Sequence, residues 1–454
     1  MARAKKETAL TPEERLQAAL VPDWEWPYKL PENWCWTNWG ECGEFVAGSG
    51  FKNEYQGFTN YDIPFYKVSS LKTANETGYL CDNTNTIDET VRKKLKAALI
   101  PANSVLFAKI GEAIRLNRRA INTVPCCVDN NMMAFIPIIC QLKYAFYWSK
   151  GIDLYDFTNA TTVPAIRKTD LEKISFPLAP LAEQQRIVDR IESLFTKLDE
   201  AKEKAQAVLD SFETRKAAIL HKAFTGELTA KWREEHGVGM ESWEHHQFSD
   251  LCAIVRGGSP RPAGDPRYYD GNIPFMKVAD ITRNDSPYVS KVEYSIKEEG
   301  LKKTRMVEAN TLLLTNSGAT LGVPAITTIR TTFNDGIAAF IGLDIDSLLF
   351  YYYFWTSKTA FLRSINMGAA QPNLNTKLIG EVEIDVPQTA ERVEIARVLN
   401  ALLSKEQQAK ETAEAALDQI DLMKKSTLAR AFRGELGTND PSEESAVELL
   451  KQII

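Results

Sequence analysis

The chain has 454 residues, 44% of them hydrophobic, and its 54 basic and 60 acidic residues give a formal net charge of −6. Such a length suggests two or three domains with sizeable cores, and the mildly acidic balance argues against a surface that binds nucleic acid everywhere. A charged, polar N-terminus and the lack of any run near 20 apolar residues argue against a signal peptide and a membrane span. The seven cysteines are odd in number and contain no Cys-x-x-Cys pair, which predicts reduced thiols in a cytoplasmic protein.

The chain opens with a predicted arm, residues 1–30, that contains one short helix. Thr11 is a suitable N-cap, Pro12 suits the first helical position, and Glu13 and Glu14 suit the positive end of the helix. Residues 31–180 and 241–386 are then predicted to be two α+β domains, because short apolar runs alternate there with Gly, Pro, Asn and Asp. Both blocks are close to neutral, with 16 basic and 15 acidic residues in 31–180 and 14 of each in 241–380.

The two blocks are copies of one another, since several stretches recur at a nearly constant spacing of 207 to 210 residues. The matches are Trp34 with Trp243, Gly48-Ser49-Gly50 with Gly257-Gly258-Ser259, Ile63–Val68 with Ile273–Val278, Val105–Gly111 with Leu312–Gly318, and Ala223–Leu228 with Ala431–Leu436. A long, fixed period of self-similarity indicates a tandem duplication, and the drift of one or two residues is what loop insertions produce.

Each domain is followed by a predicted long helix, in residues 181–240 and in residues 387–454. Apolar residues step by four and three along both segments, and the second copy keeps the register of the first at a spacing of 208. The predicted seam is Ile187, Ile191, Leu194, Leu198, Ala201, Ala205, Ile395, Leu399, Leu402, Ala409 and Ala413. Each helix needs a partner for its apolar seam, so we expect a long antiparallel two-helix coiled coil that joins the two domains with pseudo-twofold symmetry.

The repeated hexapeptide lies where both helices are expected to end. Gly226 and Gly434 are predicted C-terminal caps. The apolar residues beside them are predicted to anchor each helix to the opposite domain or to dock a partner subunit; they are Phe224, Leu228, Phe432 and Leu436. The tail from Ser442 to Ile454 is predicted to form a short amphipathic helix that closes against the opening helix.

This layout resembles the specificity subunit of type I restriction-modification systems across essentially the entire chain. The stretch Arg256–Pro262, with Ile273-Pro274-Phe275 and Asp280-Ile281-Thr282, looks like one variant of that family's target-recognition domains. Pro180–Gln184 resembles the family's entry into its first conserved helix, and the Gly-Glu-Leu helix endings also fit. The counterpart Pro387–Arg392 departs from the pattern by one inserted residue and by Arg in place of Gln.

The resemblance implies a non-catalytic subunit in which each recognition domain reads one half of a bipartite, asymmetric site in double-stranded DNA. The helices would set the spacing and dock methyltransferase subunits, two in number, with restriction subunits as possible further partners. No cofactor is expected in this chain, because S-adenosylmethionine, Mg²⁺ and ATP would belong to the partner subunits.

Candidate DNA contacts are cations and amides in the two domains, because phosphates require cations and base edges require donors and acceptors. The densest basic stretch, Arg92–Arg119, holds eight basic residues and one acidic residue, Glu112. The predicted contacts are Lys67, Arg92, Lys93, Lys94, Lys109, Arg115, Arg118, Arg119, Arg256, Ser259, Arg261, Arg267, Lys277, Arg283, Asn316, Asn373, Asn375 and Lys377. Asn373, Asn375 and Lys377 suit a structural loop equally well.

Catalytic alternatives lack their motifs. The glycine-rich stretches open no helix in a βαβ unit, so we interpret them as a shared turn rather than a nucleotide site. The chain has no Asn/Asp-Pro-Pro-aromatic tetrapeptide for a flipped adenine and no P-loop, and His245-His246 lacks a third ligand at metal spacing. A diverged DNA methyltransferase or nuclease, and a coiled-coil adaptor that binds only protein, remain the alternative hypotheses.

Overall fold

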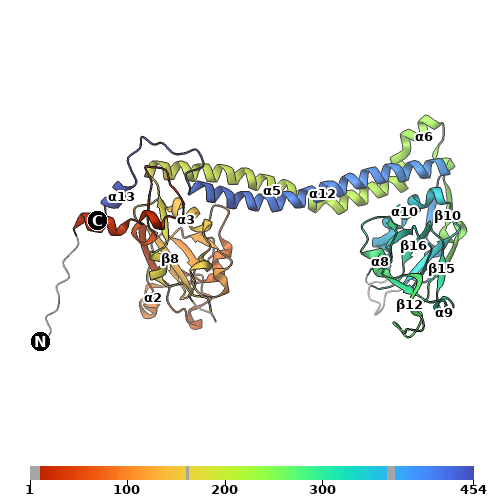
Figure 1. Cartoon of the computed structure of the whole chain (residues 1–454), viewed down its shortest axis with the longest axis horizontal. Coiled ribbons are helices and arrows are strands. Elements are labelled where there is room, and N and C mark those ends of the chain that lie inside the picture. The colour runs from red at the N-terminus through yellow and green to blue at the C-terminus, as the bar shows by residue number, and fades with distance from the viewer. Residues whose placement is uncertain (1–10, 160–162, 319, 366–373, 454) are drawn as a thin grey trace. The chain divides into compact units, whose positions relative to one another are not determined.

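The computed structural model describes residues 11–159, 163–318, 320–365 and 374–453, and it divides into two compact units. The first unit comprises Met1–Lys204 and Ala416–Ile454, and the second comprises Ala205–Ala415. Each unit combines one globular domain with part of each of two long helices, α5 (Leu181–Phe224) and α12 (Thr389–Ala431) (Figure 1).

The first domain is built on a four-stranded sheet, a three-stranded sheet and a separate strand pair. The four-stranded sheet has the order β2-β8-β5-β6, the smaller one has the order β4-β3-β7, and β1 pairs with β9. The strands are β1 (Cys35–Asn38), β2 (Gly43–Ala47), β3 (Ile63–Tyr66), β4 (Thr86–Ile87), β5 (Val105–Ala108), β6 (Arg119–Ile121), β7 (Cys127–Val128), β8 (Met132–Pro137) and β9 (Ser175–Leu178). The α-helices are α1 (Pro12–Ala19), α2 (Glu89–Leu95), α3 (Leu142–Gly151) and α4 (Lys168–Glu172).

The second domain repeats this plan, with one more strand in each of its two larger sheets. One sheet has the order β11-β19-β16-β17-β13, the other has the order β14-β12-β18-β15, and β10 pairs with β20. The strands are β10 (Glu244–Gln247), β11 (Ala253–Arg256), β12 (Tyr269–Met276), β13 (Tyr288–Val289), β14 (Tyr294–Ile296), β15 (Arg305–Val307), β16 (Thr311–Thr315), β17 (Pro324–Thr327), β18 (Thr331–Phe333), β19 (Ile337–Ile341) and β20 (Glu383–Val386). The α-helices are α6 (Ala230–His236), α7 (Phe248–Leu251), α8 (Val278–Thr282), α9 (Glu298–Leu301), α10 (Leu348–Ile365) and α11 (Thr376–Gly380).

Equivalent strands pair in the same way in both domains. β3 runs parallel to β7 and β12 runs parallel to β18, whereas β5 and β16 lie antiparallel to β8 and β19. The glycine-rich stretches lie at equivalent places, where Gly48 N–H donates to Met132 O and Gly257 N–H donates to Ile337 O. A Cβ at Gly48 would lie 1.9 Å from Asp129 O, and one at Gly257 would lie 2.3 Å from Asn334 O. Both turns therefore require glycine because the backbone passes too close for a side chain.

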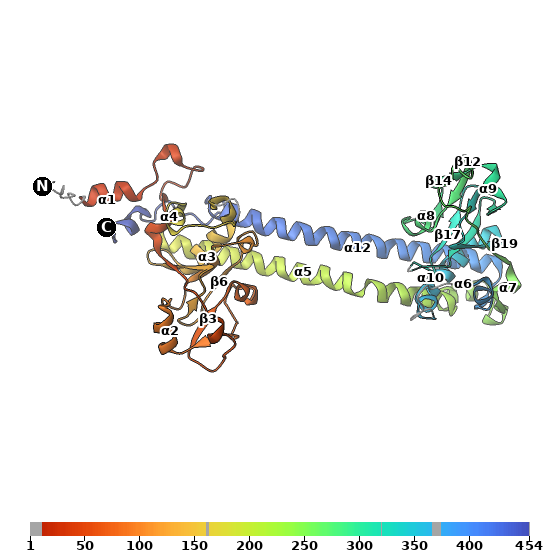
Figure 2. The ribbon, with the colours of Figure 1, turned by 90° about the horizontal axis from the view of Figure 1, so that it is seen from below.

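α5 and α12 run antiparallel in each unit, as predicted (Figure 2). In the first unit Lys424 of α12 pairs with Asp199 of α5. In the second unit Arg215 Nε of α5 lies 2.8 Å from Glu406 Oε2 of α12. Higher numbers on α5 thus meet lower numbers on α12. At 44 residues, α5 is about 66 Å long at 1.5 Å per residue.

The predicted seam is buried along most of its length. The buried members are Ile187, Ile191, Ala205, Ile395, Leu399 and Ala413, the half-buried members are Leu194, Leu198 and Leu402, and the exposed members are Ala201 and Ala409. A straight α-helix drifts by about 20° per heptad relative to a 3.5-residue repeat. Near the middle of the helices, the buried stripe therefore includes Ala205 and Ala413, whereas Ala201 and Ala409 are exposed to solvent.

Both long helices end at a glycine with a left-handed backbone, as expected for C-terminal caps. Gly226 has φ +79° and Gly434 has φ +73°. After α12, Glu435 N–H donates to Arg430 O and Gly434 N–H donates to Ala431 O, the bond pair of a Schellman motif. The apolar residues beside the caps then fold back onto a domain.

A buried glutamate near the start of each long helix ties that helix to the strand pair of its own domain. Glu183 of α5 is fully buried, and its Oε2 accepts the Trp34 Nε1–H at 2.7 Å. Glu391 of α12 is 1% exposed, and its Oε2 accepts the Trp243 Nε1–H at 3.1 Å. The repeat of Trp34 as Trp243 thus marks a shared contact with the helix.

The tail closes onto the start of the chain within the first unit. α13 (Val447–Lys451) follows Ala446, whose N–H donates to Asn33 O at 2.9 Å. Leu449 and Leu450 lie in the core of the first domain, against which Leu16 of α1 also packs. In the described part of the chain, no helix is both long enough and apolar enough to cross a membrane.

Candidate nucleic-acid interface

Three charged groups of the first domain converge where three strands end. Lys67 follows β3, Lys109 follows β5 and Asp129 follows β7. Asp129 N–H donates to Tyr66 O at 2.9 Å, and this bond holds Asp129 beside Lys67. Burial raises the pKa of Asp129 and lowers the pKa of Lys109, and the attraction between the carboxylate and the two lysines offsets only part of either shift. Burial therefore disfavours the charged forms of Asp129 and Lys109 in the isolated domain.

Further cations lie on α2, which is in contact with the 3-10 turn Asn53–Tyr55. Lys67 Nζ donates to Gln56 Oε1 at 2.8 Å, and Lys94 Nζ lies 5.3 Å from the centre of the Tyr55 ring. The predicted contacts Arg92 and Lys93 both pair with Glu89, at 2.6 Å and 3.6 Å. Lys94 and Lys93 are exposed, so α2 offers cations to a phosphate backbone.

A separate cationic turn precedes β6. Arg115 lies with its guanidinium carbon 3.5 Å from the centre of the Tyr155 ring, and Arg118 is exposed. Asn117 Nδ2 donates to Ile152 O at 2.8 Å, which holds the turn against the end of α3. The turn thus presents two arginines on a fixed backbone.

Arg119 does not belong to this surface, contrary to the prediction. Its side chain enters the core at the start of β6, where it is 5% exposed and its guanidinium carbon lies 5.5 Å from the centre of the Phe107 ring. Burial lowers the pKa of Arg119 to about 9. Arg119 Nη2 donates to Asn117 Oδ1 at 2.8 Å, so the residue supports the turn from inside.

In the second domain, polar groups converge on a hollow of about 280 Å³ beside β12. Its lining includes three predicted contacts, Ser259, Arg261 and Lys277, together with Asn334 and Asp335. Asp335 Oδ1 accepts the Ser259 hydroxyl at 2.6 Å, and its Oδ2 lies 3.5 Å from Arg261 Nη2. Lys277 Nζ lies 3.1 Å from the centre of the Tyr294 ring. The hollow therefore combines cations, an acceptor and aromatic walls, which suit recognition of a base edge beside a phosphate.

Other predicted contacts of the second domain lie apart from the hollow or are engaged elsewhere. Arg256 Nε donates to Asp335 O at 2.6 Å, behind the hollow, and Arg267 pairs with Asp265 at 2.6 Å. Arg283 is exposed at the end of α8.

The polar residues near α11 and β16 have different environments. Asn375 caps α11 by accepting the Leu378 N–H at 2.8 Å, and Lys377 is exposed, 3.7 Å from Glu381. Asn373 lies outside the described residues. Asn316 is fully buried, so it does not lie on the surface where the prediction placed it, and neither its Nδ2 nor its Oδ1 has a hydrogen-bond partner among the described residues.

Sequence reasoning missed Asp129, Asn334 and Asp335 as members of these two sites. Acidic and amide residues carry little weight in a search for basic runs, although both residue types accept or donate at base edges. Aligning the stretch from Asp129 with that from Asn334 across the repeat, at a spacing of 205, is the signal that finds them.

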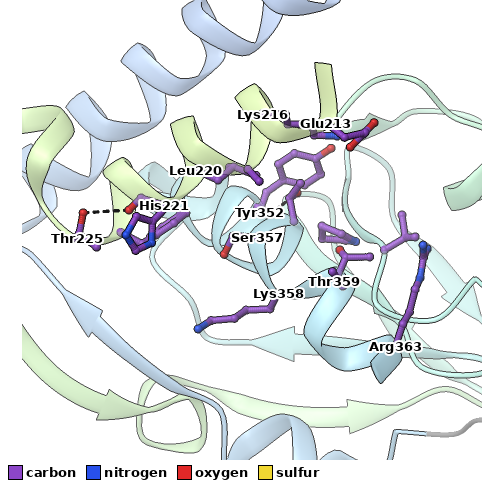
Figure 3. Close-up of a pocket in the computed structure, with 16 residues that line it drawn as sticks. Glu213, Lys216, Leu220, His221, Thr225, Tyr352, Ser357, Lys358, Thr359 and Arg363 are labelled. Carbon is purple, nitrogen blue, oxygen red and sulfur yellow. Dashed lines mark hydrogen bonds between the residues drawn. The ribbon is translucent and has the colours of Figure 1, made fainter. Parts of the chain in front are cut away.

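A hollow of about 760 Å³ lies in the second unit between α5 and α10 (Figure 3). Lys216 and Glu213 project from α5, and Lys358 and Arg363 project from α10. The lining therefore includes three cations and one carboxylate. The sequence analysis singled out none of these residues.

The apolar residues beside the two helix ends pack on domain cores, with Phe432 buried and Phe224, Leu228 and Leu436 half-buried. The Phe224 ring lies 5.4 Å from that of Phe350, and Leu228 packs against the same core. Phe432 is 4% exposed, with its ring 5.1 Å from that of Tyr144, and Leu436 packs beside it. Each long helix thus begins beside one domain and ends in the core of the other. Phe432 has no exposed surface for a partner subunit, because the Tyr144 core already covers it.

Histidines and acids do not form a metal centre in the described residues. No group of three or more His, Cys, Asp or Glu side chains has metal-binding geometry there. His245 Nδ1 lies 2.8 Å from Asp385 Oδ1 across the β10–β20 pair, and this contact raises the pKa of His245. The histidine pair is thus accounted for by surface ion pairs.

Comparison with known proteins places the duplication in a family. The family model described as "Type I restriction modification DNA specificity domain" matches twice, at residues 31–209 and 240–417. The chain is 23% identical over 464 residues to the EcoKI specificity subunit of Escherichia coli K12, covering 94% of this chain and 96% of that protein. It is 31% identical over 164 residues to the MjaIX specificity subunit of Methanocaldococcus jannaschii, covering 35% of this chain and 38% of that protein.

A solved structure shares the fold. The structure of the HsdS subunit from Thermoanaerobacter tengcongensis matches with a TM-score of 0.65 and 18% identity, covering 91% of this chain and 100% of the other. A second chain, from a study of complex assembly of the type I R-M system, matches with a TM-score of 0.64 over 90% of this chain.

Proposed function

Because the chain belongs to the type I restriction-modification DNA specificity family, we propose that it is the DNA sequence-recognition subunit of such a complex, each domain reading one half of a bipartite site. The observation that carries the proposal is the duplication of one domain with two different polar linings. The first domain places Asp129 near Lys67 and Lys109, whereas the hollow of the second domain combines Arg261, Lys277 and the Asn334 amide with the Asp335 carboxylate. Two different reading surfaces imply an asymmetric site.

In this proposal the two long helices set the spacing between the half-sites and dock two methyltransferase subunits. α5 contributes to both units and is continuous through the boundary at residues 204 and 205. The hollow between α5 and α10, with three cations and an apolar floor of Leu220 and Phe224, is an open surface on this frame for a partner. Restriction subunits are a further partner class.

The chain is assigned no reaction of its own. S-adenosylmethionine, Mg²⁺ and ATP are assigned to partner subunits, which would carry out methylation and cleavage in the cytoplasm. Much of the phosphate neutralisation is likewise assigned to those partners, because the two domains are close to neutral and affinity for DNA rises with the number of phosphates neutralised.

Mapping methylated bases in a host that expresses this chain with its methyltransferase subunits tests the proposal. The expected result is methylation at one bipartite, asymmetric sequence, which disappears when this chain is omitted. Methylation without sequence preference would overturn the proposal, and so would binding of S-adenosylmethionine by the purified chain alone. The salt dependence of DNA binding should be steeper for the complex than for the chain, and equal slopes would contradict the assignment of phosphate contacts to partners.

A further inference from the structure

The backbone hydrogen bonds of the two domains define pairs of equivalent positions near the candidate interfaces. Asp129 N–H donates to Tyr66 O, and Asn334 N–H donates to Met276 O. Lys109 N–H donates to Asn131 O, and Asn316 N–H donates to Gly336 O. Asp129 therefore corresponds to Asn334, and Lys109 corresponds to Asn316.

A second set of bonds supports the same correspondence. Ile166 N–H donates to Lys109 O at 2.9 Å, and Leu374 N–H donates to Asn316 O at 2.8 Å. Met132 N–H donates to Asp129 O, and Ile337 N–H donates to Asn334 O. The backbone hydrogen bonds around both positions are thus the same in the two domains.

The side chains at these two positions differ, while several residues of the surrounding frame recur in both domains. Phe65 and Phe275 are equivalent, Lys67 and Lys277 are equivalent, and both turns begin with a glycine. At the two positions of interest the first domain has a cation and a carboxylate, whereas the second has two amides. Domains that share a frame but read different sequences must differ in chemistry where they touch the bases.

At these positions the second domain leaves three buried polar atoms without a hydrogen-bond partner among the described residues. They are Asn316 Nδ2, Asn316 Oδ1 and Asn334 Oδ1, and an unsatisfied buried polar group lowers stability. At the equivalent places of the first domain, burial disfavours the charged forms. It raises the pKa of Asp129, whose Oδ1 accepts the Asn131 N–H at 3.0 Å, and it lowers the pKa of Lys109. Polar groups that burial destabilises at equivalent places in both copies indicate groups kept for a ligand.

Resting on the proposed function, we infer that the position occupied by Asp129 in one domain and by Asn334 in the other determines the base pair that each domain reads. Asp129 matches a G·C pair, because a carboxylate accepts from the cytosine amino group and Lys109 beside it can donate to guanine O6 or N7. Asn334 matches an A·T pair, because one asparagine amide bonds adenine N6 and N7 together. Asn316 is fully buried and is assigned no base contact. Lys67 and Lys277, which do not change, serve both domains alike as phosphate contacts.

Reciprocal substitutions in the complex with the methyltransferase subunits test the inference. Asn334→Asp gives the second domain the carboxylate of the first, and Asp129→Asn makes the reverse change. Methylation of a randomised bipartite DNA library, read by sequencing, reports base preference at every position of both half-sites. Asn310→Asp is the matched control, because Asn310 precedes the opposite end of β16 and is exposed.

Asn334→Asp should shift one base pair of one half-site from A·T toward C·G by about tenfold or more, with the other half-site and the spacing unchanged. Asp129→Asn should produce the opposite shift in the other half-site, and Asn310→Asp should match the wild type. Unchanged preferences in both variants would overturn the inference, and so would failure of both variants to assemble, since the groups would then be structural. A wild-type complex without sequence preference would instead overturn the proposed function.

Discussion

Arg233 and Glu391 form a buried ion pair that joins α6 to the start of α12, with 2.6 Å between Arg233 Nη1 and Glu391 Oε1. Their side chains are 9% and 1% exposed, and Arg233 Nη2 also donates to Gly226 O at the cap of α5. One arginine thus binds the end of one long helix and the beginning of the other within the second unit.

Replacing Arg233 with methionine should lower the free energy of unfolding of the second unit by about 3–5 kcal/mol, because Glu391 would keep a buried charge without its partner. Lys231→Met is the control, since the Lys231 side chain is 87% exposed, and it should change stability by less than about 0.5 kcal/mol. Urea unfolding followed by circular dichroism measures both. Equal midpoints for the two variants would show that the pair contributes nothing.

Gly434→Ala should destabilise the first unit more than Gly437→Ala. Both glycines have positive φ, +73° and +70°, so each alanine costs about 1–2 kcal/mol in backbone strain. A Cβ at Gly434 would in addition lie 2.4 Å from Pro31 Cγ, whereas one at Gly437 meets nothing within 4 Å. Thermal unfolding should therefore show the larger loss for Gly434→Ala, and the reverse order would contradict the cap assigned to α12.

Arg118→Ala should weaken DNA binding and Arg119→Ala should lower stability, although the two residues are neighbours. The exposed Arg118 should leave stability unchanged and reduce the salt slope of DNA binding by about 1, as loss of one phosphate contact does. Arg119→Ala should lower the free energy of unfolding by about 2 kcal/mol or more, because removal of this buried side chain leaves a cavity beside Phe107. Filter binding at several salt concentrations and denaturant unfolding separate the two outcomes. A stable Arg119→Ala with a reduced salt slope would return that residue to the DNA surface.

Thiol labelling should modify Cys81 first. Cys81 is exposed, whereas burial raises the pKa of Cys35, Cys127 and Cys252 to about 12. Mass spectrometry after brief labelling at pH 8 should find Cys81 alone, and all seven sites after unfolding in urea. If Cys35 were labelled as fast as Cys81, the Cys35 thiol would not be buried as the structure shows.

The same thiols give stability a pH dependence. The folded protein keeps these protons up to about pH 12, whereas the unfolded chain releases them from about pH 9. The unfolded state therefore binds fewer protons between these values, and the contribution to stability, complete below pH 9, should be lost as pH rises toward 12. Unfolding midpoints measured from pH 8 to pH 10 should fall, and serine at Cys35 should reduce the slope.

Insertion of four residues into both long helices, after Lys204 and after Ala415, should widen the gap between the half-sites. Four residues lengthen a helix by about 6 Å, which corresponds to about two base pairs of B-form DNA. Methylation mapping should show an altered spacing with both half-site sequences intact. Altered bases with an unchanged gap would contradict the division of labour between domains and helices.

The sequence alone determined the features that depend on local pattern and on repetition. The 208-residue period showed the duplication, the four-and-three spacing predicted α5 and α12, and Gly226 and Gly434 marked the helix ends. These predictions succeed because helix periodicity and a left-handed cap follow from residues that are close in the chain.

Only the tertiary structure decided which polar groups face outward and which groups meet. Arg119 and Asn316 belong to polar stretches, yet both side chains are buried, because the strand pairing of each domain fixes their direction. Asp129 lies near Lys67 and Lys109 because the Asp129 N–H bonds Tyr66 O at the end of β3 and the Lys109 N–H after β5 bonds Asn131 O, although these segments are distant in sequence. Long-range strand register sets such contacts, and no local pattern encodes it.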